Sequence, residues 1–394
     1  MSRIEQAVIL VAGEGQRLKP FTTYKPKPLI SIANKPILQY IIEALATNGL
    51  RHIVMIVGYK KEQIQDYFGS GSNFGIDIEY IVQKQQLGTG NALKQAKGHL
   101  HNDFLVLAGD NIIDSNTIAT FIQQAPNALL VKESQDVTQY GMVLLDKGKV
   151  KSIVEKAENP VTSLISTGTY LFTKDIFTFV EEEPVLTSAL KKMIMSGYEI
   201  AAYKTEGIWL DVVYPWDILD LNKTALETLS PSRSQTIEHG VTIKGNVSIG
   251  ANTIIRANSY ITGPAIIGES CDIGPSVYIA PSTSIGSNVI ISPFTEIKNS
   301  VIGNNVEIGS GSVIEDSIID KGCIIKGRFT ARSEKTSVSI DSEHHFVKIG
   351  AMLGESCTIS DGVTIYPGIS VGTKAQIKEL KVIRDSIPNG ALVA

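Results

Sequence analysis

An isoleucine recurs every six residues through much of the second half of the chain, and this period constrains the fold more than any other feature. The isoleucines stand at positions 237, 243, 249, 255, 261, 267, 273, 279, 285, 291 and 297. A six-residue repeat is typical of a parallel β-helix, in which three hexapeptides make one triangular coil. We therefore expect each of these isoleucines to fill the interior of a coil.

The residue four positions after each isoleucine is small or β-branched. These residues are Val241, Val247, Thr253, Ser259, Ala265, Cys271, Val277, Thr283, Val289 and Thr295. We expect them to pack near the corners of the coils. The cysteines, Cys271, Cys323 and Cys357, share this position after a repeat aliphatic residue. They are too few and too far apart for a disulfide framework or a metal cluster, so we interpret them as small core residues.

The repeat is irregular in three places. The spacing slips to five between Ile297 and Ile302 and between Ile314 and Ile319, and the pattern is interrupted over about 328–347. It then resumes at Leu353, Ile359, Ile365, Val371 and Ile377. Within the interruption, the run from Lys335 to Ile340 predicts a projecting hairpin.

The first half of the chain has a different pattern, in which apolar strand-like runs alternate with helical segments. Strands are expected at 53–57, 76–82 and 104–108, each followed by a helix, near 61–67, 89–97 and 115–124. This alternation predicts an α/β domain with a doubly wound, mostly parallel sheet. A chain of 394 residues is expected to form two domains. We predict their boundaries at 1–228 and 237–394, joined by a polar linker at 229–236.

Ligands of such sheets bind beyond the carboxyl ends of the strands, so the loops after residues 11, 82 and 108 should converge on one site. The first of these loops carries Gly13 and Gly15 directly after an apolar run, and bare backbone N–H groups there can approach phosphate oxygens. Five cations follow with only Glu14 against them: Arg17, Lys19, Lys25, Lys27 and Lys35. The loop therefore favours a polyanion, although it lacks the Gly-Lys-Ser/Thr ending of a P-loop.

The stretch from Leu10 to Leu18, followed by Pro26-Lys27-Pro28, resembles the motif of the sugar-1-phosphate nucleotidylyltransferases. It departs from that motif at Val11 and Gln16, where smaller or hydroxyl residues are usual. The resemblance implies a Rossmann-like sheet and a nucleotide contact through the backbone of Ala12, Gly13 and Gly15. It also implies two catalytic cations, with Arg17 on the β- and γ-phosphates and Lys27 on the α-phosphate.

A second motif, Gln83 to Ala92, follows the strand expected at 76–82. An amide side chain offers a donor and an acceptor in one plane, which suits a pyrimidine edge, and a glycine lets the base come close to the backbone. The resemblance assigns base recognition to Gln83, Gly88 and Thr89. The segment is most similar to uridylyltransferases, so UTP is expected first and dTTP is the alternative.

An apolar strand ends at Asp110, and Asp211 follows in Trp209-Leu210-Asp211. Mg²⁺ prefers one or two carboxylates together with phosphate oxygens and water. The resemblance identifies Asp110 and Asp211 as the metal-binding acids, with Mg²⁺ as the cofactor.

Three further segments are expected to bind the sugar phosphate. The resemblance assigns this role to Gly141, Glu155, Lys156 and Thr169. Ser166 stands where members of the family often have Asn. The function expected from all these motifs is nucleotidyl transfer from UTP or dTTP to GlcNAc 1-phosphate or glucose 1-phosphate, with release of pyrophosphate.

The second half resembles the left-handed β-helix of the hexapeptide-repeat acyltransferases, some of which are fused to nucleotidylyltransferases and use acetyl-CoA. Acetylating archaeal relatives carry His-x-x-Tyr-x-Gly-Asp and a later Asn, and neither pattern is present here. The histidines of this half are His239, His344 and His345. We expect acetyl transfer to be absent and the β-helix to support a homo-oligomer, often a trimer in relatives. An acetyltransferase remains the alternative function, and a non-catalytic regulatory subunit is a third reading.

The formal charge of −4 argues against a nucleic-acid partner. The start of the chain shows no charged and apolar leader, and no apolar run approaches the ~18 residues that span a bilayer. A cytoplasmic location without a membrane partner is therefore expected.

Overall fold

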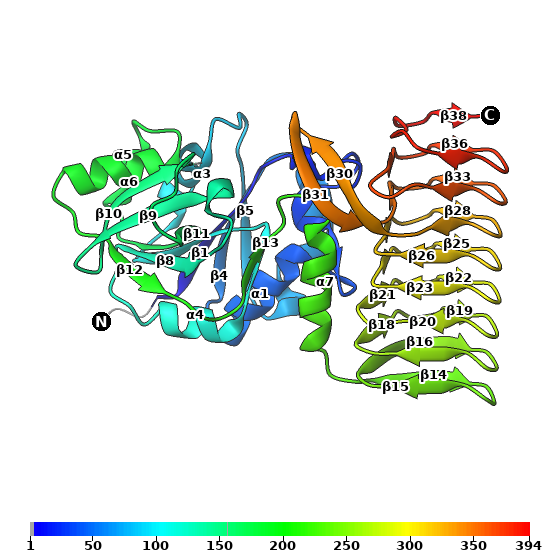
Figure 1. The fold of residues 1–394 in the computed structure, drawn as a ribbon. Coiled ribbons are helices and arrows are strands. Elements are labelled where there is room, and N and C mark those ends of the chain that lie inside the picture. The colour runs from blue at the N-terminus through cyan, green and yellow to red at the C-terminus, as the bar shows by residue number, and fades with distance from the viewer. Residues whose placement is uncertain (1–3, 156) are drawn as a thin grey trace. The chain divides into compact units, whose positions relative to one another are not determined.

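The computed structural model describes residues 4–155 and 157–394, which form two compact units (Figure 1). The first unit contains the residues up to Glu14 together with Ile37–Asp211, and the second contains Gly15–Pro36 together with Val212–Ala394. This division differs from the expected boundaries, because the cationic loop at 15–36 and the segment from Val212 onward pack with the β-helix. None of the helices in the described residues is long and apolar enough to cross a membrane.

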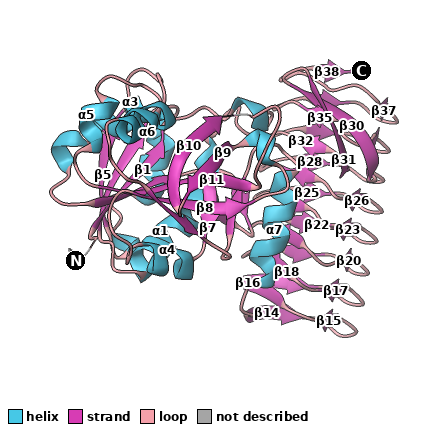
Figure 2. Cartoon of the chain, turned by 60° about the vertical axis from the view of Figure 1, so that its left-hand side comes forward, coloured by secondary structure: helices cyan, strands magenta, loops and turns pink. Residues whose placement is uncertain are grey.

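The first unit is built on a nine-stranded mixed sheet with the order β5-β4-β1-β6-β11-β8-β12-β10-β9 (Figure 2). The strands are β1 (Gln6–Val11), β4 (His52–Val57), β5 (Asp77–Val82), β6 (Phe104–Ala108), β8 (Ala128–Glu133), β9 (Gly141–Asp146), β10 (Lys149–Glu155), β11 (Leu164–Phe172) and β12 (Ala201–Lys204). The predicted strands β1, β4, β5 and β6 pair in parallel. The Rossmann-like class is confirmed, but the far half of the sheet is largely antiparallel through β9, β10 and β11.

Six helices of the described residues belong to this unit, and the three predicted ones are among them. They are α1 (Ile37–Thr47), α2 (Lys61–Phe68), α3 (Thr89–Gln95), α4 (Ser115–Phe121), α5 (Ile176–Val180) and α6 (Leu186–Met195). A separate two-stranded sheet pairs β7 (Asn111–Ile113) with β13 (Trp209–Asp211). Central strands such as β1 read as continuous apolar runs because both of their faces are covered.

The second unit is a parallel β-helix whose strands stack into three faces. One face contains β18 (Ala265–Ile267), β21 (Thr283–Ile285), β24 (Val301–Ile302), β27 (Ile318–Ile319), β32 (Met352–Leu353) and β35 (Ser370–Val371). The next contains β19 (Asp272–Ile273), β22 (Ile290–Ile291), β25 (Glu307–Ile308), β28 (Ile324–Ile325), β33 (Thr358–Ile359), β36 (Gln376–Ile377) and β38 (Leu392–Val393), and the long β16 (Val247–Ile255) joins these two faces. The third contains β15 (Thr242–Lys244), β17 (Tyr260–Thr262), β20 (Tyr278–Ile279), β23 (Glu296–Lys298), β26 (Val313–Glu315), β29 (Thr330–Ala331), β34 (Thr364–Ile365) and β37 (Val382–Ile383).

The predicted hexapeptide pattern accounts for the core of this unit. Ile255 pairs with Ile273, and Ile273 pairs with Ile291, so the isoleucines form interior ladders. The coils with a five-residue spacing stay in register, since Ile297 still pairs with Ile314. The cysteines are buried with free thiols, which confirms their interpretation as core residues.

Three expectations for the repeat need correction. Ile237 is 44% exposed because no coil precedes it. The predicted linker is partly a strand, β14 (Arg233–Ile237), which pairs with β16. The interruption begins later than residue 328, because Phe329 and Ala331 still lie in the core. The projecting hairpin is confirmed as β30 (Glu334–Ile340) and β31 (Glu343–Ile349).

The cationic loop is attached to the β-helix by buried polar contacts. The short strands β2 (Ser31–Ile32) and β3 (Lys35–Pro36) are joined by a turn at Ala33 and Asn34, which both have positive φ. The Asn34 side chain donates to the Ile285 carbonyl at 2.7 Å, and the Ala33 N–H donates to Asn222 Oδ1 at 2.9 Å. Asn222 lies on α7 (Asp217–Glu227) and itself donates to the Ser282 carbonyl. These contacts explain why residues 15–36 belong to the second unit.

Candidate active site

A cavity of about 550 Å³ in the first unit brings together residues from all four of the predicted groups of site residues. The predicted site residues that line it are Ala12, Gly13, Gln83, Gly88, Thr89, Asp110, Gly141, Glu155 and Asp211. They come from the ends of β1, β5 and β6 and from β9, β10 and β13. The expected convergence of the loops after residues 11, 82 and 108 is thus seen in the structure.

The end of β1 presents free backbone at the cavity. A side-chain carbon on Gly13 would meet no atom within 4 Å, so the space above this glycine is open. The carbonyl of Ala12 accepts a hydrogen bond from the Tyr59 N–H at 3.2 Å, which fixes the direction of the strand end. A phosphate or a base can therefore approach the backbone at Gly13.

The turn from Gln83 to Asn91 is held by its own side chains. Gln83 is buried, and its amide nitrogen donates to the Gly88 carbonyl at 3.2 Å and to Asn91 Oδ1 at 2.8 Å. Because the amide nitrogen makes both of these bonds, the amide oxygen of Gln83 remains for a ligand, and this oxygen is a hydrogen-bond acceptor. Gly88 has φ +135°, and a side-chain carbon there would come within 2.5 Å of the Pro184 carbonyl oxygen. The glycine is required by both backbone conformation and space.

The two predicted metal-binding acids are neighbours across the small β7–β13 sheet. Asp211 pairs with Asn111, and Asp110 directly precedes Asn111. Asp114 fixes this arrangement, since its carboxylate caps α4 through the Thr117 N–H and also accepts from the Ile208 N–H just before β13. The pairing of β7 with β13 therefore brings together two acids that are far apart in the sequence.

The chemistry of the cavity fits a divalent cation with phosphate. Three carboxylates line it, from Asp110, Asp211 and Glu155, and its described lining contains no Lys or Arg. Asn111 Oδ1 is buried and has no hydrogen-bond partner in residues 4–155 and 157–394. No group of three or more His, Cys, Asp or Glu side chains is placed to hold a metal among these residues. Two carboxylates would thus need phosphate oxygens or water to complete the coordination, as Mg²⁺ prefers.

The part of the cavity that β9, β10 and β11 line suits a sugar. Glu155 pairs with Gly141 across β9 and β10, and a side-chain carbon on Gly141 would lie 3.2 Å from Glu155 Oε1. Tyr140 packs edge-on against Trp209 at 5.6 Å between ring centres. Burial raises the pKa of Tyr170 to about 12, so this phenol remains a hydrogen-bond donor to a higher pH than an exposed tyrosine does.

The remaining predicted site residues are not part of this cavity lining. The register of β11 shifts between Ser166 and Tyr170, and Gly168 has φ +71°, so the regular alternation of faces is broken there. Thr169 is fully buried, whereas Thr167, Gly168 and Tyr170 line the cavity. Its assignment to sugar binding is not supported by its position. Lys156 lies outside the described residues. Gly15, Arg17 and Lys27 belong to the second unit.

Within the second unit, the two predicted catalytic cations lie in short 3₁₀ turns of the cationic loop, residues 15–36. Arg17 lies in a 3₁₀ turn, Gln16–Leu18, and Lys27 begins another, Lys27–Leu29. Gly15 has φ +71°, and a side-chain carbon on it would lie 2.9 Å from Lys27 Cβ. The Thr22 hydroxyl donates to the Gly15 carbonyl at 2.8 Å. The loop therefore folds back on itself and places Lys27 against Gly15.

Sequence reasoning missed some of the residues that line the cavity. Leu186 and Thr187 begin α6, and no motif marks them. They reach the site because the Leu186 N–H donates to Thr89 Oγ1 at 3.1 Å. The Asn91 N–H also donates to the Pro184 carbonyl at 2.9 Å, and Gly88 fits tightly against the same carbonyl. The sequence does not reveal these contacts between distant segments.

Comparison with known proteins agrees with this geometry. The sequence profile described as "Nucleotidyl transferase" matches residues 6–228. The chain belongs to the nucleotidyl transferase family. The resemblance seen in the sequence motifs is thereby confirmed, and so is nucleotidyl transfer as the type of reaction. A second profile, described as "GMPPB C-terminal domain", matches residues 261–342 within the β-helix.

Relatives of this nucleotidyltransferase extend over nearly the whole chain. A protein of Methanocaldococcus jannaschii named "Bifunctional protein GlmU" is 36% identical, covering 98% of this chain and 97% of its own. A Sulfurisphaera tokodaii protein named "Bifunctional sugar-1-phosphate nucleotidylyltransferase/acetyltransferase" is 32% identical and covers 98% of each chain. A Bacillus anthracis structure described as a glucose-1-phosphate thymidylyltransferase covers 58% of this chain and 97% of its own, with 23% identity and a TM-score of 0.53. The last likeness concerns the fold alone.

Proposed function

We propose that this nucleotidyltransferase transfers a uridylyl or thymidylyl group to a sugar 1-phosphate, either GlcNAc 1-phosphate or glucose 1-phosphate. The single observation that carries the proposal is the cavity of the first unit, in which Gln83, Glu155 and the pair of aspartates meet. The name of the Sulfurisphaera tokodaii relative includes sugar-1-phosphate nucleotidylyltransferase, which supports a sugar 1-phosphate as the acceptor.

The base preference follows from the bonds of Gln83. Its amide nitrogen is occupied by Gly88 and Asn91, so its oxygen remains as an acceptor. Uracil and thymine carry an N–H donor at N3, whereas cytosine has an acceptor there. An acceptor at Gln83 therefore favours UTP or dTTP over CTP. The methyl group that separates uracil from thymine is on C5 and not on N3, so a hydrogen bond from N3 to this amide oxygen does not distinguish the two bases.

The proposed reaction is an in-line displacement between two anions. A phosphate oxygen of the sugar 1-phosphate attacks the α-phosphorus, the bond between the α-phosphorus and the bridging oxygen breaks, and pyrophosphate leaves. The protein forms no covalent intermediate, so catalysis depends on position and charge neutralisation. Arg17 would bind the β- and γ-phosphates, and Lys27 would bind the α-phosphate, where charge develops in the transition state.

Nucleotidyltransferases of this family generally use a divalent metal ion, and we propose Mg²⁺ here. Asp110 and Asp211 would hold this ion, and when bound it would neutralise negative charge on the phosphates. Without such a cation, the three carboxylates of the cavity would repel a triphosphate. Asp110 and Asp211 would thus serve as metal ligands, while Glu155 would accept hydrogen bonds from sugar hydroxyls.

Pyrophosphate release from the purified protein tests the proposal, with Mg²⁺ and a grid of UTP, dTTP, CTP and GTP against the 1-phosphates of glucose, GlcNAc and mannose. We expect release only when UTP or dTTP is combined with glucose or GlcNAc 1-phosphate. D110N and D211N should each lose activity and also bind less Mn²⁺ in a direct titration. The absence of pyrophosphate release with every substrate pair, or release without any sugar phosphate, would contradict the proposal.

A second candidate function is acetyl transfer by the β-helix, favoured by the Sulfurisphaera tokodaii relative, whose name includes acetyltransferase and which covers 98% of each chain. The chemistry needs a general base near an amine. His345 packs against the Tyr214 ring at 4.3 Å, whereas His344 is exposed on the hairpin. Thiol release from acetyl-CoA with glucosamine 1-phosphate would reveal this activity, and a H344A variant would show whether His344 supplies the base. If no thiol is released, the expectation that this activity is absent holds.

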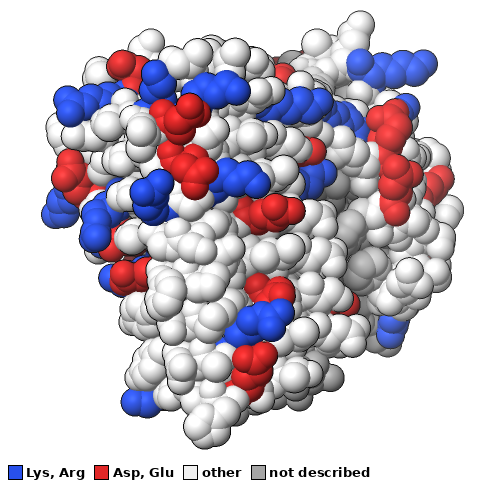
Figure 3. Space-filling model, turned by 90° about the vertical axis from the view of Figure 1, so that its right-hand side faces the viewer, with Lys and Arg blue, Asp and Glu red and all other residues white. Residues whose placement is uncertain are grey.

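Self-association through the β-helix, as a trimer or another homo-oligomer, is also proposed. In Figure 3, charged side chains crowd the upper half of the face and are sparse in its lower half, so a large uncharged area is exposed. Several large apolar side chains of the β-helix are also exposed, among them Ile290 and Phe294. Sedimentation of the purified protein would give the number of subunits. A cytoplasmic location stays a prediction.

A further inference from the structure

We infer that the β30–β31 hairpin positions Arg17 for nucleotide binding, with Asp341 at its tip as the positioning residue. The inference rests on the proposed role of Arg17 as a phosphate ligand. The hairpin arm, Glu334–Ile349, interrupts the β-helix and is not needed to continue its coils, since β27 pairs directly with β32. The residues of the arm can therefore make contacts that the β-helix itself does not require.

The tip of the hairpin arm contacts Arg17 directly. Asp341 Oδ2 accepts a hydrogen bond from Arg17 Nε at 3.2 Å, across more than three hundred residues of sequence. The Nε atom is only one of the nitrogens of the guanidinium group, so the terminal nitrogens stay available as donors for phosphate oxygens. A carboxylate at Nε fixes the plane of the group. The contact thus orients Arg17 without consuming its phosphate-binding face.

A second contact links the hairpin arm to Arg17 through Tyr214. The guanidinium carbon of Arg17 lies 5.9 Å from the centre of the Tyr214 ring. The Tyr214 hydroxyl donates to Glu343 Oε2 at 3.3 Å, and the His345 ring packs against the same tyrosine. Tyr214 therefore lies between Arg17 and one strand of the arm. Arg17 is held by the tip of the arm and by an aromatic ring that the arm itself supports.

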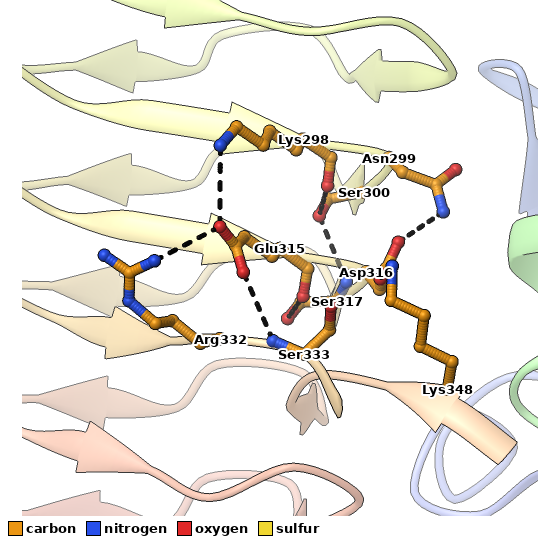
Figure 4. A network of polar contacts seen from close by, with 9 residues as sticks. All are labelled: Lys298, Asn299, Ser300, Glu315, Asp316, Ser317, Arg332, Ser333 and Lys348. Carbon is orange, nitrogen blue, oxygen red and sulfur yellow. Dashed lines mark hydrogen bonds and ion pairs between the residues drawn. The ribbon is translucent and has the colours of Figure 1, made fainter. Parts of the chain in front are cut away.

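The base of the hairpin arm is fixed to the β-helix by charged side chains (Figure 4). Where the arm begins, the Ser333 N–H donates to Glu315 Oε2 at 3.4 Å, and Arg332 pairs with the same carboxylate at 3.5 Å. Where it ends, Lys348 pairs with Asp316 at 2.9 Å. Both strands of the arm are thus anchored on adjacent residues of one coil. An anchored base lets the tip hold a defined position.

The backbone conformation of the tip indicates which substitutions would preserve the turn and can therefore test the inference. Asp341 and Ser342 have φ +52° and +67°, as in a two-residue type I′ turn, where Asn and Gly are favoured. D341N keeps the turn and an acceptor but removes the charge. D341G keeps the turn and removes the side chain. S342G changes the neighbouring turn residue and is the matched control.

The experiment compares these variants with the unaltered protein in pyrophosphate release and in calorimetric binding of UTP or dTTP. Asp341 and Arg17 are 63% and 33% exposed, so a moderate effect is expected. D341G should raise the nucleotide KM and Kd roughly two- to five-fold with kcat little changed, D341N should have a smaller effect, and S342G should have none. In an R17K background, D341G should have no further effect.

Two results would overturn the inference. D341G could behave as S342G does, or it could lower the nucleotide Kd, which would make Asp341 a competitor of the phosphates. Failure of the proposed function is a separate outcome, because the unaltered protein would then release no pyrophosphate with any substrate pair. In that case the calorimetric comparison of D341G with S342G still decides whether the arm positions Arg17.

Discussion

At the scale of single residues, Gly15 and Lys27 together fix the conformation of the cationic loop, residues 15–36. The positive φ of Gly15 and the 2.9 Å approach of its missing side chain to Lys27 leave no room for another residue. The lysine is thereby fixed at the start of its 3₁₀ turn, with Pro28 restricting the next position. A positioned cation needs little reorganisation when charge develops on the α-phosphate.

Replacement of Lys27 by alanine should reduce turnover by ~10²-fold or more, because a preorganised cation of the transition state is lost. Pyrophosphate release under saturating substrates measures the effect. Lys19, an exposed cation of the same loop, provides the matched control, and Lys19→Ala should stay within a few-fold of the unaltered protein. A Lys27→Ala variant as active as Lys19→Ala would remove Lys27 from the mechanism.

At the scale of elements, the hexapeptide repeat was predictable because each coil repeats the same local environment. Spacing alone placed Ile291 and its equivalents in the interior and the cysteines at small core positions. Spacing could not reveal that Ile237 has no coil before it. It also could not predict the antiparallel half of the first sheet, since β11 pairs with β6 and β8, which lie far from it in the sequence.

The repeat gives a comparison of equivalent residues with different burial. Ile291→Ala should lower the free energy of unfolding of the β-helix by about 3 kcal/mol, since a large core side chain is removed and a cavity remains. Ile237→Ala, at the same repeat position but 44% exposed, should cost less than about 1 kcal/mol. Urea denaturation followed by circular dichroism measures both. Equal losses would mean that the first coil is covered in solution.

The base of the hairpin arm should give a pH-dependent contribution to stability. Burial alone would raise the pKa of Asp316, but hydrogen bonds from Ser333, Asn299 and Lys348 outweigh it and hold the pKa below its usual value. A carboxyl group whose folded pKa is lowered stabilises the fold above its unfolded pKa of about 4. This stabilisation is lost as the pH falls through the lower, folded pKa.

Asp316→Asn should therefore destabilise the protein at pH 7, and the difference from the unaltered protein should shrink below about pH 4. Urea midpoints across a pH series measure this difference. Asp385→Asn, which alters an exposed carboxylate near the end of the chain, is the control and should leave the midpoints unchanged. A difference that stays constant from pH 7 to pH 3 would contradict the assignment.

On the scale of the whole molecule, the motifs predicted the content of the site but not the partners of the cationic loop. Gln83 and Asp110 could be placed because each follows a strand with its own local pattern, whereas Glu155, at the end of β10, was indicated by the family resemblance alone. The attachment of residues 15–36 to the β-helix has no such pattern. Lys25 meets Asp320 only because two segments with independent sequence signals fold against each other in the second unit. Complementarity of this kind becomes visible only in three dimensions.

The Lys25–Asp320 pair gives the sharpest test that the loop depends on the β-helix. Lys25 Nζ lies 2.6 Å from Asp320 Oδ1, and the side chains are only 15% and 7% exposed. Removal of either partner leaves a buried charge, so Lys25→Ala and Asp320→Ala should each cost roughly 3 kcal/mol, while the double variant should cost much less than their sum. Urea denaturation gives the three values.

The exposed Lys149–Glu199 pair is the matched control, whose coupling should be below about 1 kcal/mol. Additive losses at Lys25 and Asp320 would show that the loop is supported independently of this coil.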